Sequence, residues 1–436
     1  MAAPQVAGPA PGGRRLLKDS VASLLDQGML SALNLALGLV LIRLTTKENY
    51  GLYSQLYVAG ILIGTLIESV ITAPLTTLAP GMEDERRKSF IGHLAWYQRR
   101  LAALLALLSG AIAGGVAGLW QLDPHPVALG VAFALYVGCG CLREFSRSIG
   151  FIEGRAVGVL RMDLWFGLAL TAGMGALAWA GRMSLPAVLA VMAVANLAAV
   201  SLRPMAGGGD RAGRVEALKA VWQRGRWSLP GAMLAWLTNY SYLYLTALWL
   251  GVAASADLNA SRLLLMPVSL LMLAWSRVAR PHTARLLRQH DMAAVRRFTF
   301  LSVGAMELVT VVYAALLWLL LPFLETHVLG PKYSGLEPLV LAWGVYFVLY
   351  TGRWIGTSLL TSGDRFRMLL ASSVLCLVVM VAAAGYALPR WGAWGAVAAL
   401  AVVELIDLLL VWLVLLPRVQ RDLHARAALP PETRLP

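Results

Sequence analysis

The chain has 436 residues, of which 59% are hydrophobic and only 14% are charged, and its formal net charge is +14. A water-soluble domain of this size could not bury so much apolar surface, so the composition excludes an ordinary soluble protein. The positive charge does not point to nucleic acid, because the cytoplasmic loops of membrane proteins carry an excess of Lys and Arg. We therefore expect a membrane protein without a nucleic-acid partner.

Twelve long apolar runs, separated by short polar segments, follow one another along the chain. A helix needs about 20 mainly apolar residues to cross the hydrocarbon core, where its backbone polar groups must be paired internally. The runs are 21–42, 52–79, 101–120, 127–150, 159–180, 185–202, 229–250, 258–279, 299–323, 338–360, 367–388 and 393–416. The pattern predicts an all-α integral membrane protein of about twelve transmembrane helices.

Lys and Arg are unequally divided between the two sides of these runs. If the chain starts in the cytoplasm, 30 of the 37 Lys and Arg residues fall on that side and five on the other, with Arg262 and Arg353 inside runs. Miscounting one early run would move every later loop to the opposite side, so the bias indicates the orientation. Both termini are expected in the cytoplasm.

A basic polar stretch after the sixth run divides the chain into two halves. The expected organisation is a tail (1–20), a six-helix lobe (21–203), a basic linker (204–226), a second six-helix lobe (227–416) and a tail (417–436). A weak internal repeat supports this division: we expect turns at 49–53 after the first helix and at 255–259 after the seventh, 206 residues apart. Duplicated halves are common in transporters that rock one half against the other.

Charged residues also gather where the runs meet the inner surface. The segment 81–100 mixes charge with aromatic residues, which is typical of an interfacial helix on anionic lipid, although an ordinary solvated connector has the same composition. Long charged side chains at such a surface reach the headgroups at little cost. On this basis we interpret the following residues as topology signals: Arg143, Glu144, Arg147 and Asp163.

The sequence has no motif of a familiar enzyme. It lacks a phosphate-binding loop, the G-x-S-x-G and H-E-x-x-H patterns, and any cluster with metal-ligand spacing. Its three cysteines, Cys139, Cys141 and Cys376, all lie within apolar runs and give no disulfide framework. We expect a protein that is not an enzyme and needs no cofactor.

Polar and ionisable residues inside the runs are the candidate site. A charge at the bilayer centre costs about 2.5–3.5 kcal/mol on insertion scales, so such groups tend to face a bundle interior or a water-filled cavity. The substrate-binding candidates are Arg262, Arg353, Asn34 and Asn239, and the ion-coupling candidates are Glu68, Glu307, Glu404 and Asp26.

Two interpretations of these residues are open. In the first, the arginines present paired donors to an anionic head group such as a diphosphate, while Glu68 or Glu307 takes up and releases H⁺ or Na⁺. In the second, Arg353 neutralises Glu404 or Glu307, and such pairs only join helices.

Several short motifs resemble one family. They are the first outer turn R43-L-T-T-K-E-N-Y-G-L-Y53 before a helix with Glu68, W227-S-L-P230, L329-G-P-K-Y-S334, and W391-G-A-W-G-A-V397. Together they resemble the Wzx-type flippases of the multidrug/oligosaccharidyl-lipid/polysaccharide (MOP) exporter superfamily. The chain departs from the family after the seventh helix, where 255–258 replaces a Gly-x-Tyr turn, and it has no span beyond the twelfth, unlike lipid II flippases.

The resemblance implies a MATE-like fold of two six-helix lobes in the bacterial inner membrane. It implies that the protein flips an undecaprenyl-diphosphate-linked oligosaccharide for surface or exopolysaccharide biosynthesis, beside polysaccharide polymerase or export partners. One alternative is a cation-coupled antiporter for drugs or organic cations, whose cavity should be acidic. Another is a membrane polymerase or ligase of glycan assembly, which the short outer loop at 325–337 disfavours.

Overall fold

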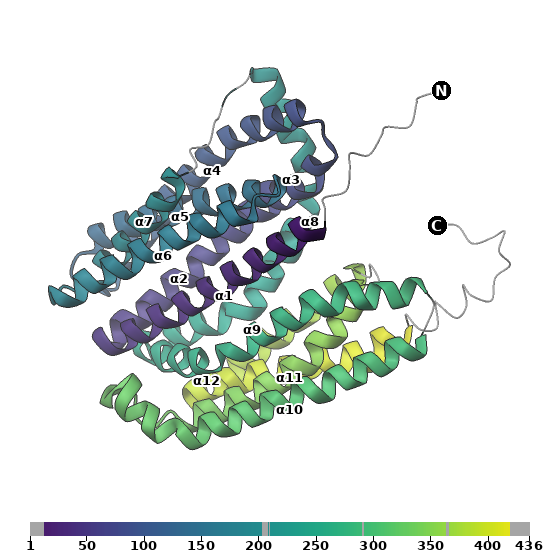
Figure 1. The fold of residues 1–436 in the computed structure, drawn as a ribbon. Helices are drawn as coiled ribbons and strands as arrows, with labels where there is room; N and C mark the ends of the chain where they lie inside the picture. Colours follow the sequence, from purple (N-terminus) through teal and green to yellow (C-terminus); the bar gives the residue numbers. More distant parts are fainter. Residues whose placement is uncertain (1–12, 203–207, 209, 290–291, 363–365, 419–436) are drawn as a thin grey trace, which may run out of the picture. The chain divides into compact units, whose positions relative to one another are not determined.

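The computed structural model describes residues 13–202, 208, 210–289, 292–362 and 366–418 (Figure 1). Over these residues the chain is helical, without strands, and the predicted all-α fold is confirmed. The predicted cytoplasmic ends fall largely on residues 1–12 and 419–436, which lie outside this part. The chain is a multi-pass membrane protein, because nine of its described helical stretches are long and apolar enough to cross a bilayer.

Each of the twelve predicted runs lies in helical structure, apart from the last residue of three runs at 120, 180 and 202. The elements are α1 (Gly13–Leu44), α2 (Lys47–Ile67), η1 (Glu68–Thr72), α3 (Ala73–Leu78), η2 (Ala79–Gly81), α4 (Asp84–Leu119), α5 (Pro126–Ile152), α6 (Ala156–Trp179), α7 (Leu185–Ser201), α8 (Arg211–Leu250), α9 (Val252–Arg288), α10 (Met292–Leu324), η3 (Glu325–Leu329), η4 (Pro331–Tyr333), α11 (Glu337–Ser362), α12 (Phe366–Leu409) and η5 (Leu410–Leu415).

The last two predicted runs are separated inside α12. Gly392 has φ 60° and ψ −144°, which is not a helical conformation and which a residue with a side chain adopts only under strain. Pro389 precedes it and cannot donate a backbone hydrogen bond. The carbonyl of Ala387 leaves no room for a side chain at Gly395, so the chain folds back after the break. The sequence expectation of a break between 388 and 393 is therefore confirmed.

Two expected turns lie elsewhere. Residues 49–53 belong to α2, which begins at Lys47, because the Thr46 hydroxyl accepts a hydrogen bond from the Asn49 amide at 3.2 Å and so caps the helix. Residues 255–259 belong to α9, because Gly251, with φ 86°, makes the whole turn from α8. The predicted turn positions at 49–53 and 255–259 were wrong.

The second expected turn packs directly on the first. Asn259 donates hydrogen bonds to the hydroxyls of Tyr50, at 2.9 Å, and Ser54, at 2.8 Å. Gln55 donates to the Ser255 hydroxyl at 3.0 Å. These contacts explain why residues 38–55 cluster with the second half of the chain, although they precede most of the first half in the sequence.

The chain forms two compact units. Unit 1 comprises residues 1–37 and 56–232, and unit 2 comprises 38–55 and 233–436. In unit 1, α5 packs against α4, α6 and α7, and in unit 2, α11 packs against α9, α10 and α12 (Figure 1). The predicted linker overlaps helix, since residues 211–226 form the first part of α8. The domain limits given by the sequence stay a prediction.

One end of unit 1 has a well-packed apolar core. It joins the start of α4, the end of α5, the first part of α8 and the bend between η1 and η2, and its most buried members are Ile71, Leu75, Ala79, Leu94, Ala95, Phe145, Ala217 and Val221. Residues 84–100 continue without a break into the apolar part of α4. The segment 81–100 is therefore mostly the end of a long helix rather than a loose connector.

Candidate functional site

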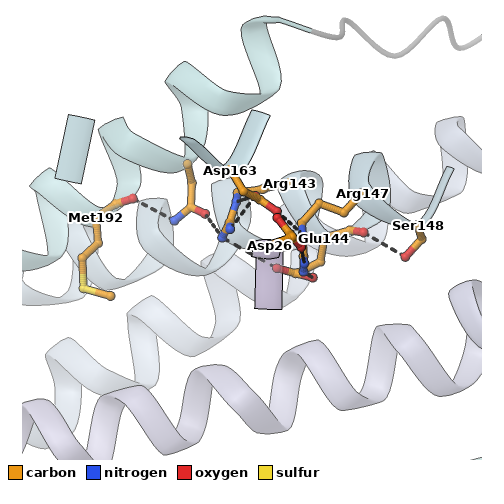
Figure 2. A network of polar contacts seen from close by, with 8 residues as sticks. Asp26, Arg143, Glu144, Arg147, Ser148, Asp163 and Met192 are labelled. Atoms are coloured by element: carbon orange, nitrogen blue, oxygen red, sulfur yellow. Dashed lines mark hydrogen bonds and ion pairs between the residues drawn. The ribbon is translucent and has the colours of Figure 1, made fainter. Parts of the chain in front are cut away.

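A network of charged side chains lies inside unit 1 (Figure 2). Asp163 on α6 accepts hydrogen bonds from two arginines of α5: Arg143 reaches Oδ1 through Nη2 at 2.7 Å and Nε at 3.0 Å, and Arg147 reaches Oδ2 through Nε at 2.7 Å. Arg147 also donates to Oδ2 of Asp26 on α1 at 2.8 Å. Asn196 of α7 accepts a longer bond from Arg143 at 3.4 Å. Four helices are thus joined by two arginines.

The burial of this network overturns a sequence interpretation. Asp163 is fully buried, and Asp26 and Arg143 are buried as well, so these groups do not reach out to the headgroups as topology signals. The guanidinium of Arg143 also lies 3.8 Å from the ring centroid of Phe166. Only Glu144, which pairs with Arg147 at 2.7 Å, is largely exposed. The reason is that Arg143 and Arg147, four residues apart, share one face of α5 that points into the unit.

The ion-coupling candidates of unit 1 differ in environment. Asp26 shares Arg147 with Asp163, yet its Oδ1 is buried and accepts no hydrogen bond within the described part of the chain. Glu68 is exposed, and no described cation lies within ion-pair distance of it. Glu68 opens the π-helical turn η1, where the Ala73 amide bonds to the Glu68 carbonyl. Pro74, which lacks an amide hydrogen, follows this turn, and single π turns inside helices are frequent at functional sites. Asn34 is half-buried on α1.

Unit 2 contains a second charged group, which joins α11 to the last part of α12. Arg353 makes a two-pronged ion pair with Glu404: Nε donates to Oε2, and Nη2 donates to Oε1 at 3.1 Å. Asp407, one turn further along α12, has its Oδ2 3.5 Å from Nη1 of Arg353. The Oδ1 of Asp407 is buried and has no partner among the described atoms. Of the two pairings that the sequence left open for Arg353, the structure has Glu404.

Arg262 on α9 has an aromatic rather than an acidic environment. Its Nη1 donates to the Tyr242 hydroxyl at 2.9 Å, and its guanidinium carbon lies 5.6 Å from the ring centroids of both Tyr240 and Trp343. No carboxylate among the residues that the structure describes pairs with it. Ring faces stabilise a cation, but they do not cancel its charge. Arg262 therefore carries a positive charge that no described carboxylate neutralises.

A row of aromatic rings on α11 connects the surroundings of the two arginines. Trp343, Tyr346, Tyr350 and Trp354 are spaced by three or four residues and so share one face, and neighbouring centroids in the row are 5.3, 6.1 and 5.4 Å apart. Arg262 lies by Trp343 and Arg353 lies by Tyr350. Seven residues separate these two rings, which is about 10 Å along a helix. This spacing was visible in the sequence, but we did not recognise it there.

The remaining candidates of unit 2 lie close to these groups. The carboxylate of Glu307 on α10 sits over Gly352, where an added Cβ would come within 2.7 Å of Oε1. Glu307 is half-buried and forms no ion pair with a described residue, so Arg353 does not neutralise it. Asn239 immediately precedes Tyr240 on α8, and its amide donates to the Ala235 carbonyl at 2.7 Å.

Pairing divides the six charged residues among the eight predicted ones into two groups. Asp26, Glu404 and Arg353 belong to ion pairs, whereas Arg262, Glu68 and Glu307 have no oppositely charged partner within the described part of the chain. An unpaired charge at membrane depth is costly, so its retention calls for a ligand, a proton or an ion. The second group is therefore the better candidate for binding and coupling, and the roles themselves stay predictions.

The fold is similar to that of transporters of the MOP superfamily. The lipid II flippase MurJ in an inward closed conformation matches with a TM-score of 0.71 and 10% identity, over 91% of this chain and 86% of that one. An inward-facing multidrug resistance MATE transporter matches with a TM-score of 0.68 and 13% identity, over 91% and 96%. A MOP transporter from Pyrococcus furiosus, whose binding pocket is described as reversed in polarity, matches with a TM-score of 0.62 and 12% identity, over 93% and 96%. No family model and no curated protein matches the sequence, and at these identities the likeness shows the fold alone.

Proposed function

We propose that this chain is a MOP-superfamily flippase, related to the Wzx type, that moves an undecaprenyl-diphosphate-linked oligosaccharide across the bacterial inner membrane. The observation that carries the proposal is Arg262, a guanidinium held among aromatic rings without a carboxylate partner in the described chain. An arginine of this kind attracts an anion.

Diphosphate is the anion that suits this arrangement. A guanidinium has five N–H donors in a planar fork, and the one described hydrogen bond of Arg262 uses a single donor, to Tyr242. The others match the oxygens of a phosphate, which accept paired hydrogen bonds. Asn239 precedes Tyr240 on α8, and its amide would have to leave the Ala235 carbonyl to donate to the same site. Arg353 is already held by Glu404, so we assign it to orienting the aromatic row rather than to the first contact with substrate.

Coupling requires a group that exchanges a cation during the cycle. Glu68 in unit 1 and Glu307 in unit 2 are carboxylates without a described cation partner, and each can take up H⁺ or Na⁺. Asp26 and Glu404 each share an arginine, so binding a cation there would compete with an existing ion pair. Glu68 also sits at the π-helical turn of the second span, where the backbone hydrogen-bond pattern changes.

The rival functions fit the structure less well. An organic cation would be repelled by Arg262, although the fold is shared with multidrug transporters. A polymerase or ligase needs catalytic groups on an outer loop. The outer segment between α10 and α11 is instead folded tightly on itself: the Glu325 carboxylate accepts a bond from the Leu336 amide at 2.8 Å, and Leu329 and Tyr333 are buried. The oligosaccharide would come from, and pass to, glycan-assembly partners on the two sides of the membrane.

Vesicles containing the full chain would test the proposal. Purified undecaprenyl-diphosphate-linked oligosaccharide is placed in the membrane, and its movement is followed by a lectin added outside. We expect Arg262→Ala and Arg262→Gln to slow flipping about ten-fold to hundred-fold, because a hydrogen bond to a charged group contributes about 1.5–3 kcal/mol. Arg262→Lys keeps the positive charge but not the planar set of donors. Its flipping rate should lie between the rates of these two variants and that of the unchanged protein.

The control is Arg182→Gln, which removes an exposed arginine from the turn between α6 and α7. Flipping by Arg262→Ala at the unchanged rate, at equal protein level, would remove the anion site from the proposal. Uptake of an organic cation by the same vesicles, with no movement of the lipid, would establish the antiporter instead.

A further inference from the structure

Two arginines meet on one tryptophan at the α4 and α8 end of unit 1. The guanidinium carbons of Arg100 on α4 and Arg214 on α8 lie 3.8 and 4.6 Å from the ring centroid of Trp96. Neither arginine forms an ion pair with a carboxylate within the described part of the chain. Because two positive charges lie at one ring, an anion that contacts both guanidinium groups would be favoured.

Local contacts hold Arg214 in this place. Asp210 caps α8 by accepting a hydrogen bond from the Gly213 amide at 3.2 Å, and it lies 3.7 Å from Nε2 of His93 on α4. The His93 ring packs so closely on Gly213 that a side chain there would have to displace it. Further along, Ala217 and Val221 of α8 are buried in the apolar core with Leu94 and Ala95. The two helices are thus fixed side by side at Trp96.

The position of Trp96 along α4 matches a membrane surface. The apolar part of α4, from 101 to 119, is 19 residues long, which is about 28 Å of helix and close to the thickness of the hydrocarbon core. Arg100 then stands at the edge of that core, and Trp96 lies one turn beyond it. Tryptophan is enriched at this level, where its ring is apolar and its N–H can be wet.

The first part of α8 has a surface that suits lipid better than water. Val215 and Trp222, seven residues apart and therefore on one face, are 55% and 46% exposed. Trp227 is 75% exposed, with Arg226 5.2 Å from its ring. Basic residues are interspersed with this apolar face: Arg211, Arg214, Lys219, Arg224 and Arg226. Exposed tryptophans beside basic side chains are typical of a helix that rests on anionic lipid.

We propose that Trp96, Arg100 and Arg214 bind the phosphate of an anionic lipid headgroup in the cytoplasmic leaflet. The guanidinium groups would supply paired donors to the phosphate oxygens, and the exposed face of α8 would lie against the neighbouring acyl chains. The bound phosphate would cancel the repulsion between the arginines and tie the start of α8 to α4. The phosphate can belong to a membrane phospholipid or to a prenyl diphosphate, and the proposal requires only that this end of unit 1 faces the cytoplasm.

Lipid titration of the purified full chain in neutral detergent, read by native mass spectrometry, tests the site. The probes are phosphatidylglycerol, phosphatidylcholine and undecaprenyl diphosphate. We expect phosphatidylglycerol to bind at least about ten-fold more tightly than phosphatidylcholine, and the Arg100→Gln/Arg214→Gln double variant to lose about 30-fold in affinity for it. Arg161→Gln, which removes an exposed arginine near the start of α6, is the matched control and should bind as the unchanged protein does.

A melting curve of each variant shows that it is folded. Binding of undecaprenyl diphosphate alone, lost in the double variant, would support the phosphate site and assign it to the prenyl lipid. Equal affinity of the double variant and the unchanged protein for every probe would overturn the proposal, as would equal binding of the charged and zwitterionic phospholipids without any binding of the diphosphate. Because the titration involves no transport, its failure leaves the proposed flipping activity standing, and the converse also holds.

Discussion

Each unit contains two arginines that are buried or half-buried, but the two units neutralise them differently. In unit 1, Arg143 pairs with Asp163, and Arg147 pairs with both Asp163 and Asp26, so two cations match two buried carboxylates. In unit 2, Arg353 has both Glu404 and Asp407, whereas Arg262 has none within the described chain. Two arginines therefore belong to a balanced network in unit 1, whereas the two arginines of unit 2 give two separated charges.

The comparison indicates different roles for the charged network of unit 1 and the arginines of unit 2. A balanced buried network repays its desolvation only when every partner is present, so it holds helices α1, α5, α6 and α7 in one arrangement. A separated pair of charges leaves an electric field along α11, between Arg262 and the carboxylates beside Arg353. A field that is already present in the protein attracts a charged ligand without reorganisation. We therefore propose a structural role for the network of unit 1 and a binding role for Arg262 in unit 2.

The largest effect should follow loss of Asp163. Asp163→Asn leaves Arg143 without its only buried carboxylate, and breaking one partner of a buried ion pair costs about 3–5 kcal/mol. We expect little folded protein in detergent, measured as the monodisperse fraction and its melting temperature. Glu144→Gln is the control: its carboxylate is 58% exposed, so the cost should stay below about 1 kcal/mol.

A melting temperature of Asp163→Asn within the error of the unchanged protein would show that the network does not hold unit 1 together. The double variant Arg143→Met/Asp163→Leu sharpens the test, since removing both partners avoids an unpaired buried charge. It should be more stable than Asp163→Asn. Equal losses in the two variants would mean that packing, and not charge, is responsible.

A smaller loss is expected for the ion pair of unit 2. Glu404→Gln leaves Arg353 with Asp407, whose Oδ2 is already 3.5 Å from Nη1. We therefore expect the free energy of unfolding, measured by denaturation in detergent, to fall by about 1–3 kcal/mol. Asp407→Asn should cost less, because the two-pronged bond to Glu404 remains. The reverse order, with Asp407→Asn the more damaging, would show that Asp407 is the true partner of Arg353.

A still smaller loss should follow removal of the ion pair between Lys47 and Asp257. These side chains are 2.7 Å apart and about a quarter exposed, and the pair joins α2 to α9 within unit 2. Lys47→Met should lower the free energy of unfolding by about 0.2–1 kcal/mol, as for other accessible ion pairs. Raising the salt concentration should weaken the same ion pair in the unchanged protein. Thermal melting at low and high salt measures both. A variant whose melting temperature depends on salt as strongly as that of the unchanged protein would contradict this assignment.

The sequence predicts the helices well, since hydropathy is a local property of each segment. It also locates the break before Gly392, where proline and glycine interrupt an apolar run. The turns after the first and seventh helices were placed several residues too late, because the capping by Thr46 and the single-residue turn at Gly251 depend on backbone conformation. The partner of Arg353 was narrowed to two residues, and only packing could choose between Glu404 and Glu307.

The charged network of unit 1 was misread for a physical reason. Depth along a span follows from counting residues, but the direction in which a side chain points depends on how the helix is rotated against its neighbours. Helix α6 is apolar nearly all round, so its sequence does not indicate the face that carries Asp163. The spacing of Arg143 and Arg147 did indicate a shared face of α5. Whether that face met lipid or protein was settled by tertiary packing.

The smallest expected effect concerns an exposed carboxylate, Asp210, at the start of α8. A hydrogen bond from the Gly213 amide lowers the pKa of Asp210 below its ordinary value of 3.8. A lowered folded pKa means that the carboxylate stabilises the helix above pH 3.8 and that this contribution disappears as the pH falls through the lowered value. Asp210→Asn should therefore speed hydrogen exchange in the first turn of α8 by about two-fold to five-fold at neutral pH, as for loss of a charged cap.

Between pH 8 and 5 this difference between Asp210→Asn and the unchanged protein should stay constant, because the carboxylate remains ionised throughout that range. Exchange is read by mass spectrometry of a peptide covering 211–220, with rates corrected for their intrinsic pH dependence. The nearby His93 ring offers a competing explanation, since it lies 3.7 Å from Asp210. Protection that changes with pH over this range would mean that the contact with His93, and not the cap by Asp210 alone, controls the helix start.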